Sequence, residues 1–95
     1  MADVRAKKPE AEFLLVSSIC PNREACLYGN QEDYPAALAA LCGNGTVLAN
    51  VTAVHQELLK RKRYMDMTGN NVNHPNDYLH RIYAQVLMAL TAPQL

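Results

Sequence analysis

The stretch on which the expected fold depends is the segment 74–90, which reads HPNDYLHRIYAQVLMAL. Its large apolar side chains recur at helical spacing, at Leu79, Ile82, Tyr83, Val86, Leu87 and Leu90. This spacing places them on one face of an α-helix. Pro75 is tolerated in the first turn of a helix and Pro93 ends one, so we predict an amphipathic helix over residues 74–91.

A second apolar pattern lies upstream of this segment. Its members follow one another at intervals of four, three and four residues, at Val47, Val51, Val54 and Leu58. The pattern predicts a long helix over residues 46–65, with a basic run near its end that complements the helix dipole. A shorter helix is expected to begin near Asp33, with Pro35 in its first turn.

These segments together predict an all-α fold. We expect a small bundle of three to four helices, built around a long antiparallel helical hairpin formed by residues 46–65 and 74–91. Residues 1–8 carry charge and little apolar content, which indicates a flexible N-terminal tail, and residues 9–95 form a single helical domain. The apolar run 13–19 fits either helix or strand, and helix is favoured because no second strand is evident.

Charge and length narrow the class of protein. The 95 residues contain nine Lys or Arg and nine Asp or Glu, a balance that does not indicate a dedicated nucleic-acid or membrane binder. No apolar run reaches the roughly 20 residues of a membrane span, and no clear signal peptide is present. We therefore expect a cytoplasmic protein whose three cysteines are reduced thiols.

Cysteines and histidines, which could bind a metal or act in catalysis, are present, but no known catalytic or metal-binding motif contains them. Cys20 and Cys26 are spaced more widely than the cysteines of zinc knuckles, and Cys42 with His55 could complete a ligand set only in principle. His74 and His80 are six residues apart, so we expect them at a loop and on a polar helix face. We predict no catalytic, cofactor-binding or metal-binding residues, and no enzyme activity.

The favoured hypothesis is a non-enzymatic protein–protein interaction module that acts as an adaptor, inhibitor or regulator. We expect it to self-associate as a homo-oligomer through its amphipathic helices, because a chain of this size cannot cover two apolar stripes well. Tyrosine and methionine are enriched at protein interfaces. The candidate partner-binding residues are Tyr64, Met65, Met67, Tyr78 and Tyr83.

Two other functions remain open. The first is a small DNA-associated transcriptional regulator, because Ala39 and Gly43 fit the spacing of a helix-turn-helix unit within residues 33–59. Its phosphate-binding candidates are the basic residues Lys60, Arg61, Lys62, Arg63 and Arg81. The second is a ligand-binding protein or enzyme whose site lies at an oligomer interface, with His, Tyr and Arg from different subunits.

One local resemblance bears on the regulatory alternative. The stretch MTGNNVN at residues 67–73, leading into Leu79 and Ile82, resembles a loop-to-helix stretch in small helical bacterial biofilm regulators of the AriR type. The resemblance implies a small all-helical regulator.

Overall fold

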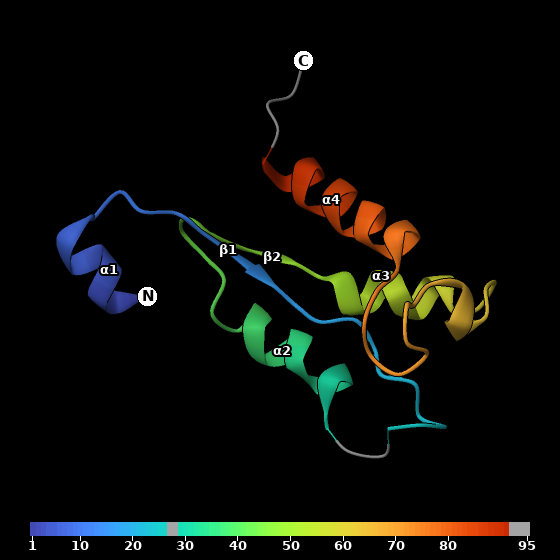
Figure 1. The fold of residues 1–95 in the computed structure, drawn as a ribbon. Coiled ribbons are helices and arrows are strands. Elements are labelled where there is room, and N and C mark those ends of the chain that lie inside the picture. Colours follow the sequence, from blue (N-terminus) through green and yellow to red (C-terminus); the bar gives the residue numbers. More distant parts are fainter. Residues whose placement is uncertain (27–28, 92–95) are drawn as a thin grey trace.

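The computed structural model describes residues 1–26 and 29–91 of the chain, and Figure 1 shows their arrangement. In chain order the elements are α1 (Ala2–Lys7), β1 (Phe13–Val16), η1 (Gln31–Asp33), α2 (Tyr34–Ala39), β2 (Thr46–Ala49), α3 (Val51–Leu58), η2 (Tyr64–Asp66) and α4 (Asp77–Thr91). The fold is therefore a small mixed α/β fold.

The two strands form a parallel pair, and this overturns the predicted all-α bundle. Phe13 lies opposite Thr46, and Val16 lies opposite Ala49. Parallel strands need a crossover connection, which here passes through η1 and α2. The run 13–19, predicted as helix, contains a strand instead. Its partner strand is Thr46–Ala49, which lies within the segment predicted as a long helix.

Local chemistry explains why residues 46–49 leave the expected helix. Gly45 has a φ of 73°, a left-handed conformation that redirects the chain into β2. Asn50 then caps α3, because its side-chain oxygen accepts a hydrogen bond of 3.0 Å from the N–H of Ala53. The helix therefore begins at Val51, and the spacing of its apolar residues belongs partly to a strand.

The predicted antiparallel helical hairpin is wrong for the same reason. α3 ends at Leu58, so residues 46–65 comprise a strand, a short helix and the turn that leads to η2. Two turns of helix cannot span the length of α4, and the hairpin does not form. The all-helical fold implied by the resemblance at residues 67–73 is likewise wrong, because this segment is a loop within a mixed fold.

The C-terminal helix is confirmed, although it begins three residues later than predicted. α4 packs Leu79 into a core with Ile19, Val51 and Met67. Around this core lie partly buried apolar side chains from α3, the residue after it and α4, namely Leu58, Leu59, Ile82, Tyr83 and Val86. The core therefore joins the segment after β1 to α3, the loop before α4 and α4 itself.

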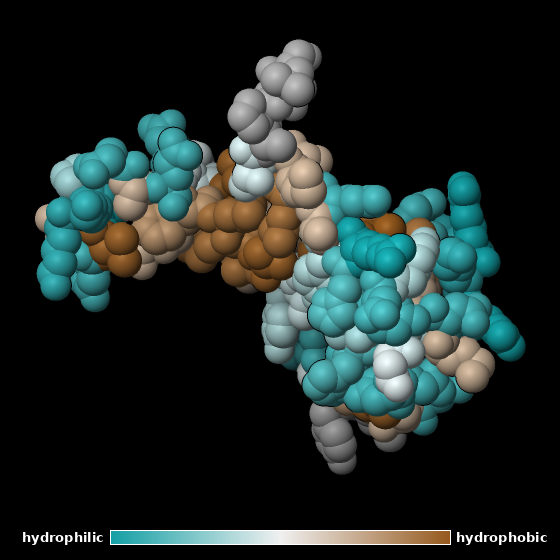
Figure 2. All heavy atoms as spheres, turned by 45° about the horizontal axis from the view of Figure 1, so that its top comes forward, coloured by the Kyte–Doolittle hydropathy of each residue, from teal (hydrophilic) through white to brown (hydrophobic). Residues whose placement is uncertain are grey.

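The N-terminal segment is helical and lies apart from the core. Within the segment predicted as a tail, residues Ala2–Lys7 form α1, which lies at one end of the molecule in Figure 1. Figure 2 shows hydrophobic atoms gathered on the surface over the strands and the C-terminal part of α4. Across residues 1–26 and 29–91, none of the helices has the length and apolar character that a membrane crossing requires.

Candidate functional site

The carboxyl ends of the two strands define one edge of the sheet. In open parallel sheets, ligands bind in the loops that follow this edge. Here β1 runs into Ser17, which is buried and whose hydroxyl lies 3.3 Å from the side-chain oxygen of Asn50, at the end of β2. The same hydroxyl accepts a hydrogen bond of 3.1 Å from the N–H of Thr52. Ser17 thus joins the strand ends and is fully engaged in the fold.

The segment after β1 packs against the loop before α4, residues 67–76, which we call the His74 loop. Asn22 donates from its backbone N–H to the carbonyl of Val72 and from its side chain to the carbonyl of Asn71, both at 2.8 Å. The hydroxyl of Tyr64 lies 2.6 Å from the carbonyl of Cys20 and 2.9 Å from that of Val72. These contacts tie the His74 loop and Tyr64 to residues 20–22, in the segment after β1.

Asn70 holds the His74 loop together from inside. Its side-chain oxygen accepts three backbone hydrogen bonds, from Val72 at 2.9 Å and from Asn73 and His74 at 3.0 Å each. Three donors on one oxygen fix which way the amide faces. The amide nitrogen of Asn70 therefore points outward and donates to the side-chain oxygen of Asn73 at 3.1 Å.

Two asparagine side chains meet Nδ1 of His74. The side-chain oxygen of Asn73 lies 2.5 Å from Nδ1, and the amide nitrogen of Asn70 lies 3.0 Å from the same atom. The Asn73 oxygen is an acceptor and pairs with a protonated Nδ1, whereas the Asn70 amide is a donor and pairs with an unprotonated one. The His74 side chain is exposed. Within residues 1–26 and 29–91, no hydrogen-bond partner of Nε2 is observed.

The backbone of the His74 loop is also constrained. Asn71 has a φ of 58°, the left-handed region that a residue other than glycine rarely occupies. Asn22 holds its carbonyl, and the N–H of Gly69 donates to the carbonyl of His74 at 2.9 Å across the base of the loop. Asparagine tolerates this conformation better than most residues, and the two hydrogen bonds hold the loop in it. The loop therefore presents His74 from a rigid support.

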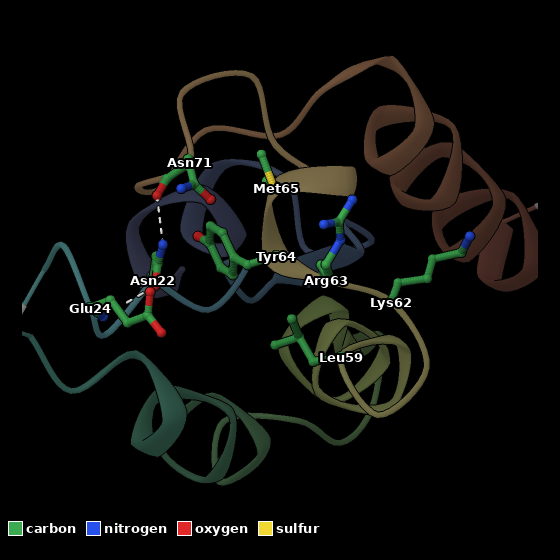
Figure 3. A pocket seen from close by; sticks show the side chains of 8 residues that line it. All are labelled: Asn22, Glu24, Leu59, Lys62, Arg63, Tyr64, Met65 and Asn71. Atoms are coloured by element: carbon green, nitrogen blue, oxygen red, sulfur yellow. Dashed lines mark hydrogen bonds between the residues drawn. The ribbon is translucent and has the colours of Figure 1, made fainter.

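A cavity of about 480 Å³ opens beside the His74 loop (Figure 3). Its lining residues are Asn22, Glu24, Leu59, Lys62, Arg63, Tyr64, Met65 and Asn71. The cavity shares Asn71 with the loop and Asn22 with the segment after β1. Burial raises the pKa of Tyr64 to about 12, so this phenol stays protonated.

The five predicted partner-binding residues do not form one surface. Tyr64 and Met65 line the cavity, whereas Met67 is fully buried in the core. Tyr78 lies beneath Lys62, whose Nζ is 5.0 Å from the centre of its ring. Tyr83 is half-buried against the core, and burial raises its pKa. The structure thus brings together only Tyr64 and Met65.

The basic residues proposed for phosphate binding lie in different surroundings. Lys60 pairs with Glu57 at 2.9 Å, and Arg63 pairs with Asp66 at 3.4 Å. Lys62 lies over Tyr78, while Arg61 and Arg81 are exposed. The run follows the end of α3 instead of forming its last turns. DNA binding stays a prediction.

The cysteine and histidine residues considered as metal ligands do not form a site. Cys20 is buried, and this burial raises the pKa of its thiol to about 11. His55 is fully buried, and its Nδ1 accepts the N–H of Cys20 at 2.9 Å. No three potential ligands gather into a metal site in the part of the chain that the structure describes.

Comparisons with known proteins found no matching family model, no matching curated protein and no matching solved structure. The site is therefore argued from its geometry. Sequence reasoning treated His74 as an ordinary loop residue and missed its support. The available signal was the cluster of three asparagines within four residues directly before it, because asparagine side chains bond readily to nearby backbone.

Proposed function

We propose that the chain is a hydrolase-type protein in which His74 is the general base. This develops the alternative of an enzyme or ligand-binding protein with a site at an oligomer interface. The observation that carries it is the 2.5 Å contact between Nδ1 of His74 and the side-chain oxygen of Asn73, on an exposed ring held by its loop. In the proposed tautomer Nδ1 donates to Asn73, and Nε2 carries the lone pair. The favoured hypothesis of self-association through amphipathic helices depended on a helical hairpin, and that support is gone.

The proposed reaction is the hydrolysis of an ester. Nε2 of His74 accepts a proton from water as the water oxygen bonds to the carbonyl carbon of the ester. The imidazolium then returns this proton to the departing alkoxide oxygen, so the histidine ends as it began. Asn73 keeps the ring oriented by accepting a hydrogen bond from Nδ1–H throughout the reaction. A third group plays this role in catalytic triads.

The position of the loop adds support. His74 lies in a loop that packs through Asn71 and Val72 on Asn22, in the segment after β1. Within the described residues, Ser17 is the hydroxyl joining the strand ends, and its hydrogen bonds engage it in the fold. We therefore assign the nucleophile to water and propose that a partner subunit completes the substrate pocket. A cytoplasmic location remains part of this proposal and agrees with three cysteines that no disulfide joins.

The first prediction tests His74 against a matched histidine. The exposed His80 lies on α4, so H80Q removes an equivalent imidazole outside the loop. We expect H74Q to lower kcat/KM for p-nitrophenyl acetate at least about a hundredfold, the range of general-base catalysis. H80Q should change it less than about twofold, because His80 takes no part in the proposed step.

The same assay can overturn the proposal. Any exposed imidazole cleaves this ester slowly, so equal losses in H74Q and H80Q would identify non-specific reaction. Nitrogen NMR of the His74 ring gives an independent measurement of the proton position. A ring protonated at Nε2 at neutral pH would remove the physical basis of the mechanism.

A further inference from the structure

The outer edge of β1 offers hydrogen-bonding groups to another strand. The N–H groups of Phe13 and Ser17 donate to the carbonyls of Gly45 and Ala49, at 2.7 and 3.1 Å. In a parallel ladder, alternate residues face the neighbouring strand. Leu14 and Val16 therefore direct their N–H and C=O groups away from β2. They form an open edge with two donors and two acceptors.

This edge lacks the features that keep sheet edges apart. Residues 13–16 contain no charged residue, no proline and no glycine. Natural edge strands are usually blocked by such residues or covered by another element. Here α2 and α4 both contact β2, whereas the principal contacts of β1 are with β2 itself. Val16 is exposed to 44 %, although its neighbours in the strand are half-buried.

The whole chain exposes more surface than a compact monomer of its mass. Its accessible area is 6739 Å², whereas a folded chain of 10.5 kDa usually exposes about 5,400 Å². The excess is about 1,300 Å², and a standard protein interface buries about 800 Å² per partner. The molecule thus has enough uncovered area for a stable dimer. Its net charge of zero adds no repulsion between copies.

We propose that a second copy of this chain pairs with the open edge of β1, antiparallel and about a two-fold axis at Leu15. The outward-facing residues then match: Leu14 of one copy lies opposite Val16 of the second copy, and the reverse. Each pair exchanges two backbone hydrogen bonds. The result is a continuous four-stranded sheet in which β1 is no longer an edge.

A groove lies over the strands and the end of α4, next to the open edge. A cavity of about 410 Å³ is lined by Glu12, Phe13, Leu14, Gly45, Val47, Leu90 and Thr91. Leu14 and Val47 are paired in the register, so they share a face of the sheet, and Val16 shares it by alternation. Val16 of the second copy is placed beside Leu14 on this face. The hydrophobic surface in Figure 2 includes this region.

The test compares two valines of equal exposure. Val16 and Val47 are both 44 % exposed, but only Val16 lies on the open edge. We expect light scattering after size-exclusion chromatography to give twice the 10.5 kDa chain mass for the wild type and V47K. V16K should give the mass of one chain, with a dissociation constant raised at least about tenfold, because it buries an unpaired charge in the interface.

Hydrogen exchange in the wild type gives a second test, which does not depend on the folding of V16K. In the wild-type dimer, the amides of Leu14 and Val16 should exchange slowly at high protein concentration and faster on dilution. A wild type that remains monomeric at about 500 µM overturns the proposal, and so does a V16K dimer as stable as the wild type. Fast exchange at Leu14 and Val16 in a dimer would place the interface on another surface.

Discussion

His55 shows how much the surroundings of a single residue can change its role. Its side chain is fully buried. Nδ1 accepts the N–H of Cys20, and the Tyr64 ring lies 5.5 Å from the imidazole centre. Nε2 has no hydrogen-bond partner among residues 1–26 and 29–91, and burial lowers the pKa of the ring. His55 is therefore held neutral within the core.

This burial predicts a loss of stability in acid. The folded chain keeps His55 neutral, whereas the unfolded chain binds a proton below its ordinary pKa of 6.5. Acid thus favours the unfolded state, and the free energy of unfolding should fall as the pH drops through that value. One proton contributes a slope of up to about 1.4 kcal/mol per pH unit. Urea denaturation between about pH 8 and about pH 5 measures it.

The matched variant is H55N, whose side-chain oxygen can take the place of Nδ1 as the acceptor for Cys20. We expect H55N to be less stable than the wild type at neutral pH, because it leaves a cavity, and to have a shallower acid slope. H80Q removes an exposed histidine and should retain the wild-type slope. An unchanged slope in H55N would show that other groups govern the acid response.

At the scale of the element, the turn into β2 depends on Gly45 and not on the nearby Gly43. Gly45 has a φ of 73°, and an added Cβ would lie 3.3 Å from the guanidinium of Arg5. That guanidinium bonds to the carbonyl of Asn44 and the hydroxyl of Thr46. Gly43 has no heavy atom within 4 Å of an added Cβ.

G45A is therefore expected to destabilise the protein by about 1–2 kcal/mol, because alanine is strained at positive φ and the added methyl group crowds Arg5. G43A should change stability by less than about 0.5 kcal/mol, or raise it slightly by restricting the unfolded chain. The midpoints of urea denaturation compare the two. Equal losses would mean that the conformation of Gly45 does not control the turn.

At the scale of the whole molecule, the chain is extended. Its Cα radius of gyration is 15.1 Å, compared with about 12 Å for a compact domain of this length, and its axes measure 44 × 35 × 19 Å. The small core of Ile19, Val51, Met67 and Leu79 lies beyond the strands, so the sheet contributes few buried side chains of its own. Stability should therefore depend on the proposed dimer.

Thermal unfolding provides the whole-molecule prediction. If dimerisation stabilises the fold, a tenfold rise in protein concentration should raise the Tm by about 3–6 °C. In V16K the Tm should be independent of concentration, whereas V47K should respond as the wild type does. A wild-type Tm that does not change with protein concentration would show that dimerisation contributes nothing to stability.

The local sequence predicts much of the structure of the candidate site, but it does not predict where the site lies in the fold. The asparagines at positions 70, 71 and 73 predict a loop with side-chain to backbone bonds, and such bonds form within a few residues. That loop packs on the segment after β1 through the contact of Asn22 with Asn71, and Tyr64 reaches the same segment at Cys20, across 49 and 44 residues of sequence. Spacing along the chain could not reveal these contacts.

The periodic pattern of residues 77–91 sufficed to determine α4, because a long helix satisfies its own backbone and needs its neighbours only for one face. Residues 13–16 and 46–49 are different. A strand of four residues has no internal hydrogen bonds, so each exists only because the other lies beside it. Pairing across some thirty residues is a tertiary event, and it alone decided that this chain is α/β.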